Sequence, residues 1–171
     1  MEQIEHETCP LCGTKSLALT EDEMDIPYFG KVYVFSMSCS SCKYYKSDVE
    51  AEERKDPCKI VFTVEKEEDL KVRVVKSSEA TVKVPQMRMS VTPGPSSIGY
   101  VSNVEGVIDR FVEIIEKERD STDEEDVRKN AKNLLKKIWK VKCGDMPLKI
   151  IIEDPSGNSA IISEKAQVTK L

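Results

Sequence analysis

Two cysteine pairs with the same internal spacing constrain this chain more than any other feature. Cys9 and Cys12 form the first pair, and Cys39 and Cys42 form the second after an interval of 26 residues. A two-residue spacer folds the backbone into a tight knuckle in which both thiolates converge, and zinc takes four such ligands in a tetrahedron with each sulfur at ~2.3 Å. Two knuckles at this separation are typical of a zinc ribbon, so we predict that the four cysteines bind one structural Zn²⁺ ion.

The residues beside the cysteines support a knuckle geometry. Pro10 presets a turn φ, and Gly13 tolerates a positive φ where the chain leaves the first turn. Lys43 stands at the matching place after Cys42, so the second turn has to tolerate a side chain. His6 precedes Cys9 by three residues and can in principle replace a thiolate, but we expect it to be solvated.

Other uses of cysteine fit the pattern less well. A redox C-x-x-C pair sits at the start of a helix, and neither pair here opens a helical pattern. Thiolates alone do not exclude iron at the same four positions. A site closed by four cysteines leaves no open coordination position, which makes the metal structural rather than catalytic. Cys58 and Cys143 have no partner at this spacing, and we expect them to be buried or idle thiols.

The expected setting of the chain is cytoplasmic. Its start is acidic and lacks the apolar stretch of a signal peptide, and no segment approaches the ~18 apolar residues of a membrane span. In a reducing compartment, cysteines serve metal or redox chemistry before disulfides.

Acidity is concentrated in the cysteine-bearing segment. Residues 1–50 contain nine acidic and four basic side chains, a net charge of −5, which equals the net charge of the whole chain. Such a surface suits a basic partner better than a phosphate backbone.

A short aromatic segment lies between the two knuckles. Pro27 and Gly30 bracket Tyr28 and Phe29 after Ile26, and this composition predicts a loop or turn. These rings either pack against the ribbon or its neighbouring domain, which we favour, or form an exposed aromatic anchor for a protein partner.

The remainder of the chain indicates a β domain with a helical insertion. Short segments at 59–64, 71–75, 80–84, 87–91, 148–152 and 159–163 are rich in β-branched residues, which predicts an antiparallel sandwich, jelly roll or similar barrel. The turn at 154–158 contains Pro155 and Gly157. We place the ribbon at 1–50 and the β domain at 51–171.

A helical period replaces the strand pattern at about 103–141. Val104, Val107, Ile108, Phe111 and Ile115 fall on one face of a first helix. Val127, Ala131, Leu134, Leu135 and Ile138 do so on a second helix. The short polar join predicts a helical hairpin.

Three details of this hairpin are also predicted. Capping pairs at Ser102 with Glu105 and at Thr122 with Glu125 start the two helices. Trp139 is expected to pack on the sheet.

Together these residues resemble the ZPR-type zinc-finger family. The resemblance covers roughly residues 7–163, and the matching motifs follow one another in the family's order. They are Cys9-Pro-Leu-Cys-Gly13, Asp25-Ile-Pro-Tyr-Phe-Gly30, the knuckle at Ser36–Cys42, Val74-Val-Lys-Ser77, Ala80-Thr-Val82, Thr92-Pro-Gly94, Asn103-Val-Glu-Gly106 and Asp154-Pro-Ser-Gly-Asn-Ser159.

The resemblance implies a mainly β fold with an α insertion: a C4 zinc ribbon followed by a double-stranded β-helix (jelly-roll-like) domain that carries a helical hairpin. Eukaryotic members have two such modules, and this chain resembles the single-module archaeal form. The family's metal role transfers to Cys9, Cys12, Cys39 and Cys42.

The function implied by the family is protein binding. Eukaryotic members bind translation elongation factor 1 alpha and are implicated in its folding. The family's Ile-Pro-aromatic segment matches Ile26, Pro27, Tyr28 and Phe29, which are candidate partner contacts.

Two other function classes are weighed against this one. A nucleic-acid-binding ribbon is the alternative, although residues 1–50 contain no arginine for phosphate contacts. An enzyme built on a double-stranded β-helix would need histidine and carboxylate ligands inside the barrel, and the β domain has no histidine. A carboxylate or thiol mechanism at Cys58 or Cys143 is formally open, but we expect no enzyme.

Overall fold

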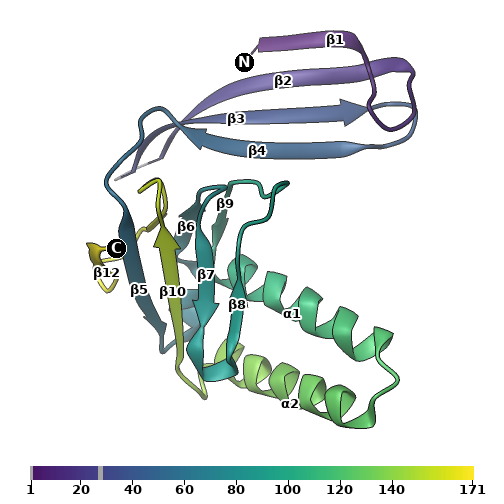
Figure 1. Ribbon diagram of the computed structural model, residues 1–171. Coiled ribbons are helices and arrows are strands. Elements are labelled where there is room, and N and C mark those ends of the chain that lie inside the picture. The colour runs from purple at the N-terminus through teal and green to yellow at the C-terminus, as the bar shows by residue number, and fades with distance from the viewer. Residues whose placement is uncertain (1, 27–28) are drawn as a thin grey trace.

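The chain forms a long antiparallel sheet at its N-terminal end, below which lies a second β unit with two projecting helices (Figure 1). This computed structural model describes residues 2–26 and 29–171. The strands are β1 (Glu2–Thr8), β2 (Lys15–Ile26), β3 (Gly30–Cys39), β4 (Tyr45–Ala51), β5 (Cys58–Val64), β6 (Arg73–Lys76), β7 (Thr81–Val84), β8 (Met89–Val91), β9 (Tyr100–Asn103), β10 (Leu148–Asp154), β11 (Ala160–Ile161) and β12 (Gln167–Lys170). The helices are α1 (Val104–Ser121) and α2 (Glu125–Lys142), with 3-10 turns η1 (Glu67–Lys71) and η2 (Pro85–Met87).

The N-terminal sheet has the strand order β1-β2-β3-β4, and each neighbouring pair is antiparallel. Strands β2 and β3 pair without interruption from Leu17 opposite Cys39 to Ile26 opposite Gly30. The two cysteine knuckles therefore lie at one end of this sheet. Its other end, where β2 turns into β3, lies against the second β unit (Figure 1).

The second β unit consists of two antiparallel sheets. Strands β12-β5-β10-β7-β8 form one sheet, and β11-β6-β9 form the other. Buried side chains from both sheets meet in one core, with Phe62 from β5, Val74 from β6 and Ile152 from β10 among its members. The central strand β10 alternates buried and less buried residues, as expected where one face of a strand packs on a core.

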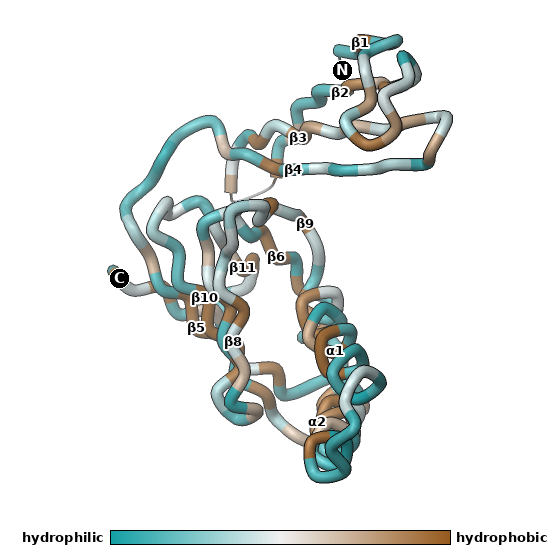
Figure 2. The backbone as a smooth tube through the Cα atoms, turned by 45° about the vertical axis from the view of Figure 1, so that its right-hand side comes forward, coloured by the Kyte–Doolittle hydropathy of each residue, from teal (hydrophilic) through white to brown (hydrophobic). Residues whose placement is uncertain are grey.

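The helical hairpin closes one side of this core. The five apolar residues predicted to share a face of α1 are all buried, and α2 buries Ala131, Ile138 and Val141. The apolar sides of the two helices turn toward each other and toward the sheets (Figure 2). Within the described residues, neither helix combines the length and apolarity needed to cross a lipid bilayer.

Three predicted details of the hairpin are wrong. Ser102 belongs to β9, where it pairs with Val74, so Asn103 is the N-cap of α1 and its Oδ1 accepts from the Gly106 N–H at 2.8 Å. The N-cap of α2 is Glu124 rather than Thr122, and it makes no side-chain capping bond. Trp139 is 66% exposed and does not pack on the sheet.

A separate apolar cluster joins the two β units. Ile26 and Val32 from the N-terminal sheet pack with Val75 from β6, and all three are buried. Phe29, Val49 and Val101 lie around them. A hydrogen bond from the Gly99 N–H to Asp48 Oδ1, at 2.6 Å, crosses the same junction.

Candidate metal centre

The two cysteine knuckles have the same backbone hydrogen bonds. In the first, the Cys9 N–H donates to the Thr14 carbonyl at 2.9 Å and the Gly13 N–H donates to the Cys9 carbonyl at 2.9 Å. In the second, the Cys39 N–H donates to the Tyr44 carbonyl at 2.8 Å and the Lys43 N–H to the Cys39 carbonyl at 3.0 Å. Each C-x₂-C segment is thus held by hydrogen bonds within its own turn, and the pairing of β2 with β3 places the two turns side by side.

The residue after each knuckle takes a left-handed conformation. Gly13 has a φ of 72° and Lys43 a φ of 61°. Glycine adopts this region freely, whereas lysine adopts it only against a steric cost. The sequence-based expectation that the second turn accommodates a side chain is confirmed.

The four sulfur atoms form a compact cluster. Sγ of Cys9 lies 3.7 Å from Sγ of Cys42, Sγ of Cys12 lies 3.7 Å from Sγ of Cys39, and all four lie within 4.8 Å of one another. Ligands at ~2.3 Å from a tetrahedral zinc ion are separated by about 3.8 Å. The cysteines are therefore clustered suitably for one zinc ion, and no protein ligand position is left open.

Two hydroxyl groups lie beside the sulfurs. Thr14 Oγ1 is 3.0 Å from Sγ of Cys12, and Ser16 Oγ is 3.2 Å from Sγ of Cys39. The two hydroxyls are themselves 2.6 Å apart. Hydrogen bonds from such hydroxyls to the ligand sulfurs orient the ligands and tune a metal site. Neither residue was predicted from the sequence as part of the site, although the hydroxyl groups and the position shortly after the first knuckle could have indicated it.

The protein environment already favours thiolate at part of the cluster. The backbone N–H of Cys42 and then the Ser16 hydroxyl lower the pKa of Cys39 to about 5. The Thr14 hydroxyl lowers the pKa of Cys12. The Tyr44 backbone lowers the pKa of Cys42, but burial and the neighbouring thiols outweigh it and raise the pKa to about 12. The last protons of such a cluster leave when a metal ion supplies positive charge.

The apolar core around the cysteines is small. Leu17 packs with the buried Cys9 and Cys39, and the partly buried neighbours are Leu19, Met37, Cys42 and Tyr44. A sheet with so little buried apolar surface gains much of its folding free energy from a metal ion. The role of this metal site is therefore structural: metal binding stabilises the fold of the ribbon.

The other candidate ligands lie outside the cluster. His6 is exposed on β1, and the group of clustered ligands found among the described residues does not include it. Cys58 and Cys143 are partly buried free thiols, and burial raises the pKa of Cys58.

Ile26 and Phe29, the described residues of the predicted partner-contact segment, differ in their burial. The Ile26 side chain is fully buried in the junction between the β units. Pro27 and Tyr28 lie outside the described residues. Phe29 is partly buried, and the Lys55 ammonium lies 4.4 Å from the centroid of its ring.

Models of two protein domains match the chain in succession. The ZPR1 zinc-finger domain matches residues 3–55, which contain the four-cysteine cluster, and the ZPR1 jelly-roll domain matches residues 68–170. The second match confirms the predicted jelly-roll-like domain, and it covers the hairpin and the strands of the two facing sheets except β5.

Individual relatives agree with the domain matches. A ZPR1-like protein of Methanocaldococcus jannaschii is 39% identical over 96% of this chain and 83% of its own length. A ZPR1-like protein of Pyrococcus horikoshii is 39% identical over the whole chain and 78% of its own length. The zinc finger chaperone zpr1 of Schizosaccharomyces pombe is 32% identical over 90% of the chain, which spans 33% of that longer protein. The chain belongs to the ZPR1 zinc-finger family, with a zinc-binding ribbon followed by a jelly-roll domain.

Proposed function

We propose that this chain is a zinc-stabilised protein-binding module that interacts with translation elongation factor 1 alpha or assists its folding. The proposed zinc ligands are Cys9, Cys12, Cys39 and Cys42. The observation that carries the proposal is the family match, within which the fission yeast relative is named a zinc finger chaperone. Elongation factor 1 alpha is the proposed partner because the chain resembles the ZPR-type family, whose eukaryotic members bind that factor.

The surface of the ribbon supports binding to a protein. Among the described residues, it exposes large apolar side chains at Ile4, Leu11, Met24 and Tyr45. Leu11 is 70% exposed between the first two cysteines, and Tyr45 is 66% exposed at the start of β4. Exposed apolar and aromatic groups held on a rigid scaffold are the usual anchors of protein interfaces.

The charge of the ribbon adds a second element of recognition. Residues 1–50 carry a net charge of −5, so the apolar anchors stand in an acidic field. Such a field favours a basic partner surface and makes the association rate sensitive to salt. We therefore expect a specific complex that weakens as ionic strength rises.

The Ile26–Phe29 segment stays a proposed contact region. Because Ile26 is buried in the junction, its proposed role is to hold the turn in place. Phe29 is the member whose described side chain is partly accessible, and it lies on the side of the ribbon that faces the jelly-roll domain.

A binding titration tests the proposal. Zinc-loaded protein is titrated against elongation factor 1 alpha of the same organism, with GDP, with a GTP analogue and without nucleotide. We expect micromolar or tighter binding in at least one nucleotide state, and a loss of affinity for Tyr45→Ala. Val168→Ala is the matched control, because Val168 is 65% exposed on β12 of the other domain. The absence of detectable binding in all three states would remove the elongation factor as partner.

A further inference from the structure

Helix α2 carries a concentrated positive charge on its exposed side. Between Glu125 and Lys142 it has seven basic and two acidic side chains, a net charge of +5, in a chain whose net charge is −5. Three of its lysines stand four residues apart and are all exposed; they are Lys132, Lys136 and Lys140. Because an α-helix rises 1.5 Å per residue, their Cα atoms are spaced by about 6 Å along the helix axis. We call these three residues the lysine ladder.

No acidic neighbour on α2 offsets the lysine ladder. Residues three or four positions apart lie next to each other on a helix, and α2 has no acidic residue at those distances from any of the three lysines. Like charges at this spacing repel one another, so the spacing itself does not stabilise α2. Among the described residues, the ion pairs that join α2 to α1 are made by Lys142, with Glu105 and Asp109.

The only tryptophan of the chain lies beside the lysine ladder. Trp139 follows Lys136 by three residues and Lys132 by seven, and these spacings place the three side chains on one face of the helix. The Trp139 side chain is 66% exposed, whereas the preceding Ile138 is 2% exposed in the core. The buried side of α2 therefore packs on the jelly-roll core, and the exposed side presents an indole ring next to positive charges.

The composition of this face decides between three kinds of partner. The cores of protein–protein interfaces are depleted in charged residues, and in lysine above all, whereas this face is rich in lysine. A membrane surface needs a free apolar face, and that side of α2 is buried. A positively charged surface with an aromatic ring is typical of sites for single-stranded nucleic acid, in which cations contact phosphates and bases stack on the ring.

The acidic parts of the molecule leave this face accessible to a polyanion. In both overall views, the hairpin lies at the end of the molecule opposite the N-terminal sheet, whose segment carries the net charge of −5 (Figure 1, Figure 2). On the neighbouring helix α1, Glu116 and Asp120 pair with Arg119. Salt screens exposed charges over ~8 Å at physiological ionic strength, so the charges of the ladder itself dominate the potential beside it.

We propose that this face of α2 binds single-stranded nucleic acid, with Lys132, Lys136 and Lys140 contacting backbone phosphates and Trp139 stacking on a base. This activity goes beyond the proposed function and does not rest on it. Every base has a π-face, and neither kind of contact involves the sugar. We therefore expect little preference for base sequence, or for ribose over deoxyribose.

The fluorescence of Trp139 gives a direct readout, because the chain has no other tryptophan. The zinc-loaded full chain is titrated with an oligouridylate of about ten nucleotides, a length within the range of single-strand sites. We expect saturable quenching at low salt. The affinity should fall as salt rises, with a slope of log K against log salt of about −0.7 for each phosphate contact. The absence of quenching at low salt would overturn the proposal.

Removing the charges of the ladder tests the phosphate contacts. The triple variant Lys132→Gln, Lys136→Gln, Lys140→Gln should bind the oligouridylate at least about tenfold more weakly, and its salt slope should be smaller by about 2. Its thermal stability should stay close to that of the wild type, because all three side chains are exposed. An unchanged salt slope would overturn the assignment of these lysines to phosphates.

A matched control separates the ladder from net charge. Lys46, Lys149 and Lys170 are exposed on β4, β10 and β12. Changing them together, as Lys46→Gln, Lys149→Gln and Lys170→Gln, removes the same charge from other surfaces and should leave the affinity nearly unchanged. An equal loss of affinity in the two triple variants would reduce the effect to net charge and overturn the site.

Two variants of Trp139 test the stacking contact, with the anisotropy of a fluorescein-labelled oligouridylate as the readout. Trp139→Ala should lower the affinity about fivefold or more, and Trp139→Phe, which keeps an aromatic ring, should lose less. Both should keep the salt slope of the wild type, since the phosphate contacts remain. Equal affinity of Trp139→Ala and wild type would overturn the stacking role.

Other probes test the class of partner. An oligoglutamate with the same number of charges and vesicles of phosphatidylglycerol should bind more weakly than the oligouridylate. Equally tight binding of the oligoglutamate would assign the face to an acidic protein segment, and equally tight binding of the vesicles would assign it to a membrane; either result would overturn the proposal. An oligodeoxythymidylate should bind like the oligouridylate, and a strong preference for either would overturn a site that contacts only phosphates and base faces.

Discussion

Individual residues decide whether each zinc knuckle closes. Gly13 and Lys43 occupy equivalent left-handed positions, and the N–H of each donates to the first cysteine of its pair. These local bonds hold Cys9 near Cys12 and Cys39 near Cys42 within each turn. Such short-range geometry is why the metal site could be located from the sequence.

Replacing one ligand tests the metal site directly. Cys39→Ser should lose zinc and unfold the ribbon, because the free energy of metal binding is also folding free energy in such a site. Metal analysis gives the zinc stoichiometry, and amide hydrogen exchange reports the order of β2 and β3. Cys58→Ser is the control and should retain zinc, since Cys58 lies outside the cluster. A Cys39→Ser protein with bound zinc and full thermal stability would refute the ligand assignment.

Replacing Gly157, in the turn after β10, should lower the stability of the protein. Its φ is 69°, and an added Cβ would meet the Asp56 carbonyl oxygen at 2.2 Å. Gly157→Ala should therefore destabilise the protein by more than about 1 kcal/mol. Gly94→Ala meets no atom within 4 Å and should change stability by less than about 0.5 kcal/mol. Urea unfolding of both variants measures the difference, and equal effects would contradict the strained turn.

The buried carboxylate of Asp154 predicts a pH dependence. Burial raises its pKa, but hydrogen bonds from Ser159 and Ser156 outweigh burial and hold the pKa below its ordinary value. A depressed native pKa stabilises the fold above the unfolded-state pKa of about 3.9, and this stability is lost as pH falls through the native pKa. Asp154→Asn should cost about 1–3 kcal/mol near neutral pH. The difference in unfolding free energy between wild type and Asp154→Asn should shrink at pH values below about 4.

Unfolding experiments on both proteins at matched pH isolate this effect. Acid also releases zinc by protonating the cysteines, but that loss is common to wild type and Asp154→Asn and cancels in the difference. A gap that stays constant from neutral pH to below about pH 4 would show that Asp154 is not the responsible group.

Among the secondary-structure elements, the two helices of the hairpin were predicted correctly from the spacing of their apolar residues. The period of apolar residues identified both helices and the buried face of α1, since a 3.6-residue repeat is a property of one segment. The N-cap of α1 is Asn103 rather than the predicted Ser102, because Ser102 lies in β9 and pairs with β6. The competition between a strand and a cap depends on a partner strand, which lies far away in the sequence.

Two aromatic residues of the hairpin give opposite predictions. Phe111 is 3% exposed in the core of the jelly-roll domain, and Phe111→Ala should cost about 3–5 kcal/mol. Trp139 is largely exposed on α2, and Trp139→Ala should change stability by less than about 1 kcal/mol. Chemical unfolding followed by circular dichroism measures both, with zinc content unchanged. A larger loss for Trp139→Ala than for Phe111→Ala would contradict the packing of α2.

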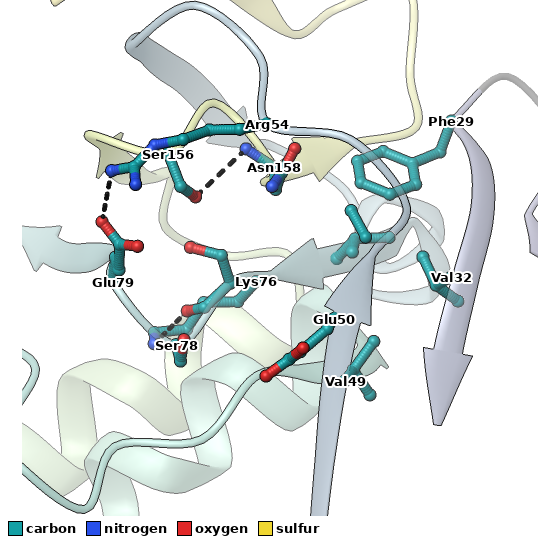
Figure 3. A pocket seen from close by; sticks show the side chains of 13 residues that line it. Phe29, Val32, Val49, Glu50, Arg54, Lys76, Ser78, Glu79, Ser156 and Asn158 are labelled. Atoms are coloured by element: carbon teal, nitrogen blue, oxygen red, sulfur yellow. Dashed lines mark hydrogen bonds and ion pairs between the residues drawn. The ribbon is translucent and has the colours of Figure 1, made fainter. Parts of the chain in front are cut away.

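At the scale of the whole molecule, the junction couples the two units that we propose as ribbon (1–50) and jelly-roll domain (51–171). The apolar contact of Ile26, Val32 and Val75 is one part of the coupling. The other is the close approach of Gly99 to β4, where an added Cβ would meet the Val49 carbonyl oxygen at 2.3 Å. Residues of both units also line a cavity at this junction (Figure 3).

Removing the polar link should loosen this junction. Asp48→Ala leaves the buried Gly99 N–H without its acceptor, at a cost of about 1–3 kcal/mol. We expect faster hydrogen exchange at Gly99 and faster proteolysis of the segment 52–57, with zinc still bound. Lys46→Ala, at an exposed position on the same strand, is the control and should change neither rate. Unchanged protection of Gly99 in Asp48→Ala would contradict a junction held by this bond.

The sequence by itself determined the zinc ribbon, the β character of the second unit and the hairpin, because each depends on residues that are near one another in the chain. The clustering of four cysteines also followed from the sequence, since two local knuckles need only one hairpin to bring them together. Only the tertiary structure decided that Ile26 is buried, that Trp139 is exposed and that the charged residue Lys76 is buried. Burial and charge pairing at these positions depend on contacts between segments that are distant in sequence, and no local pattern encodes such contacts.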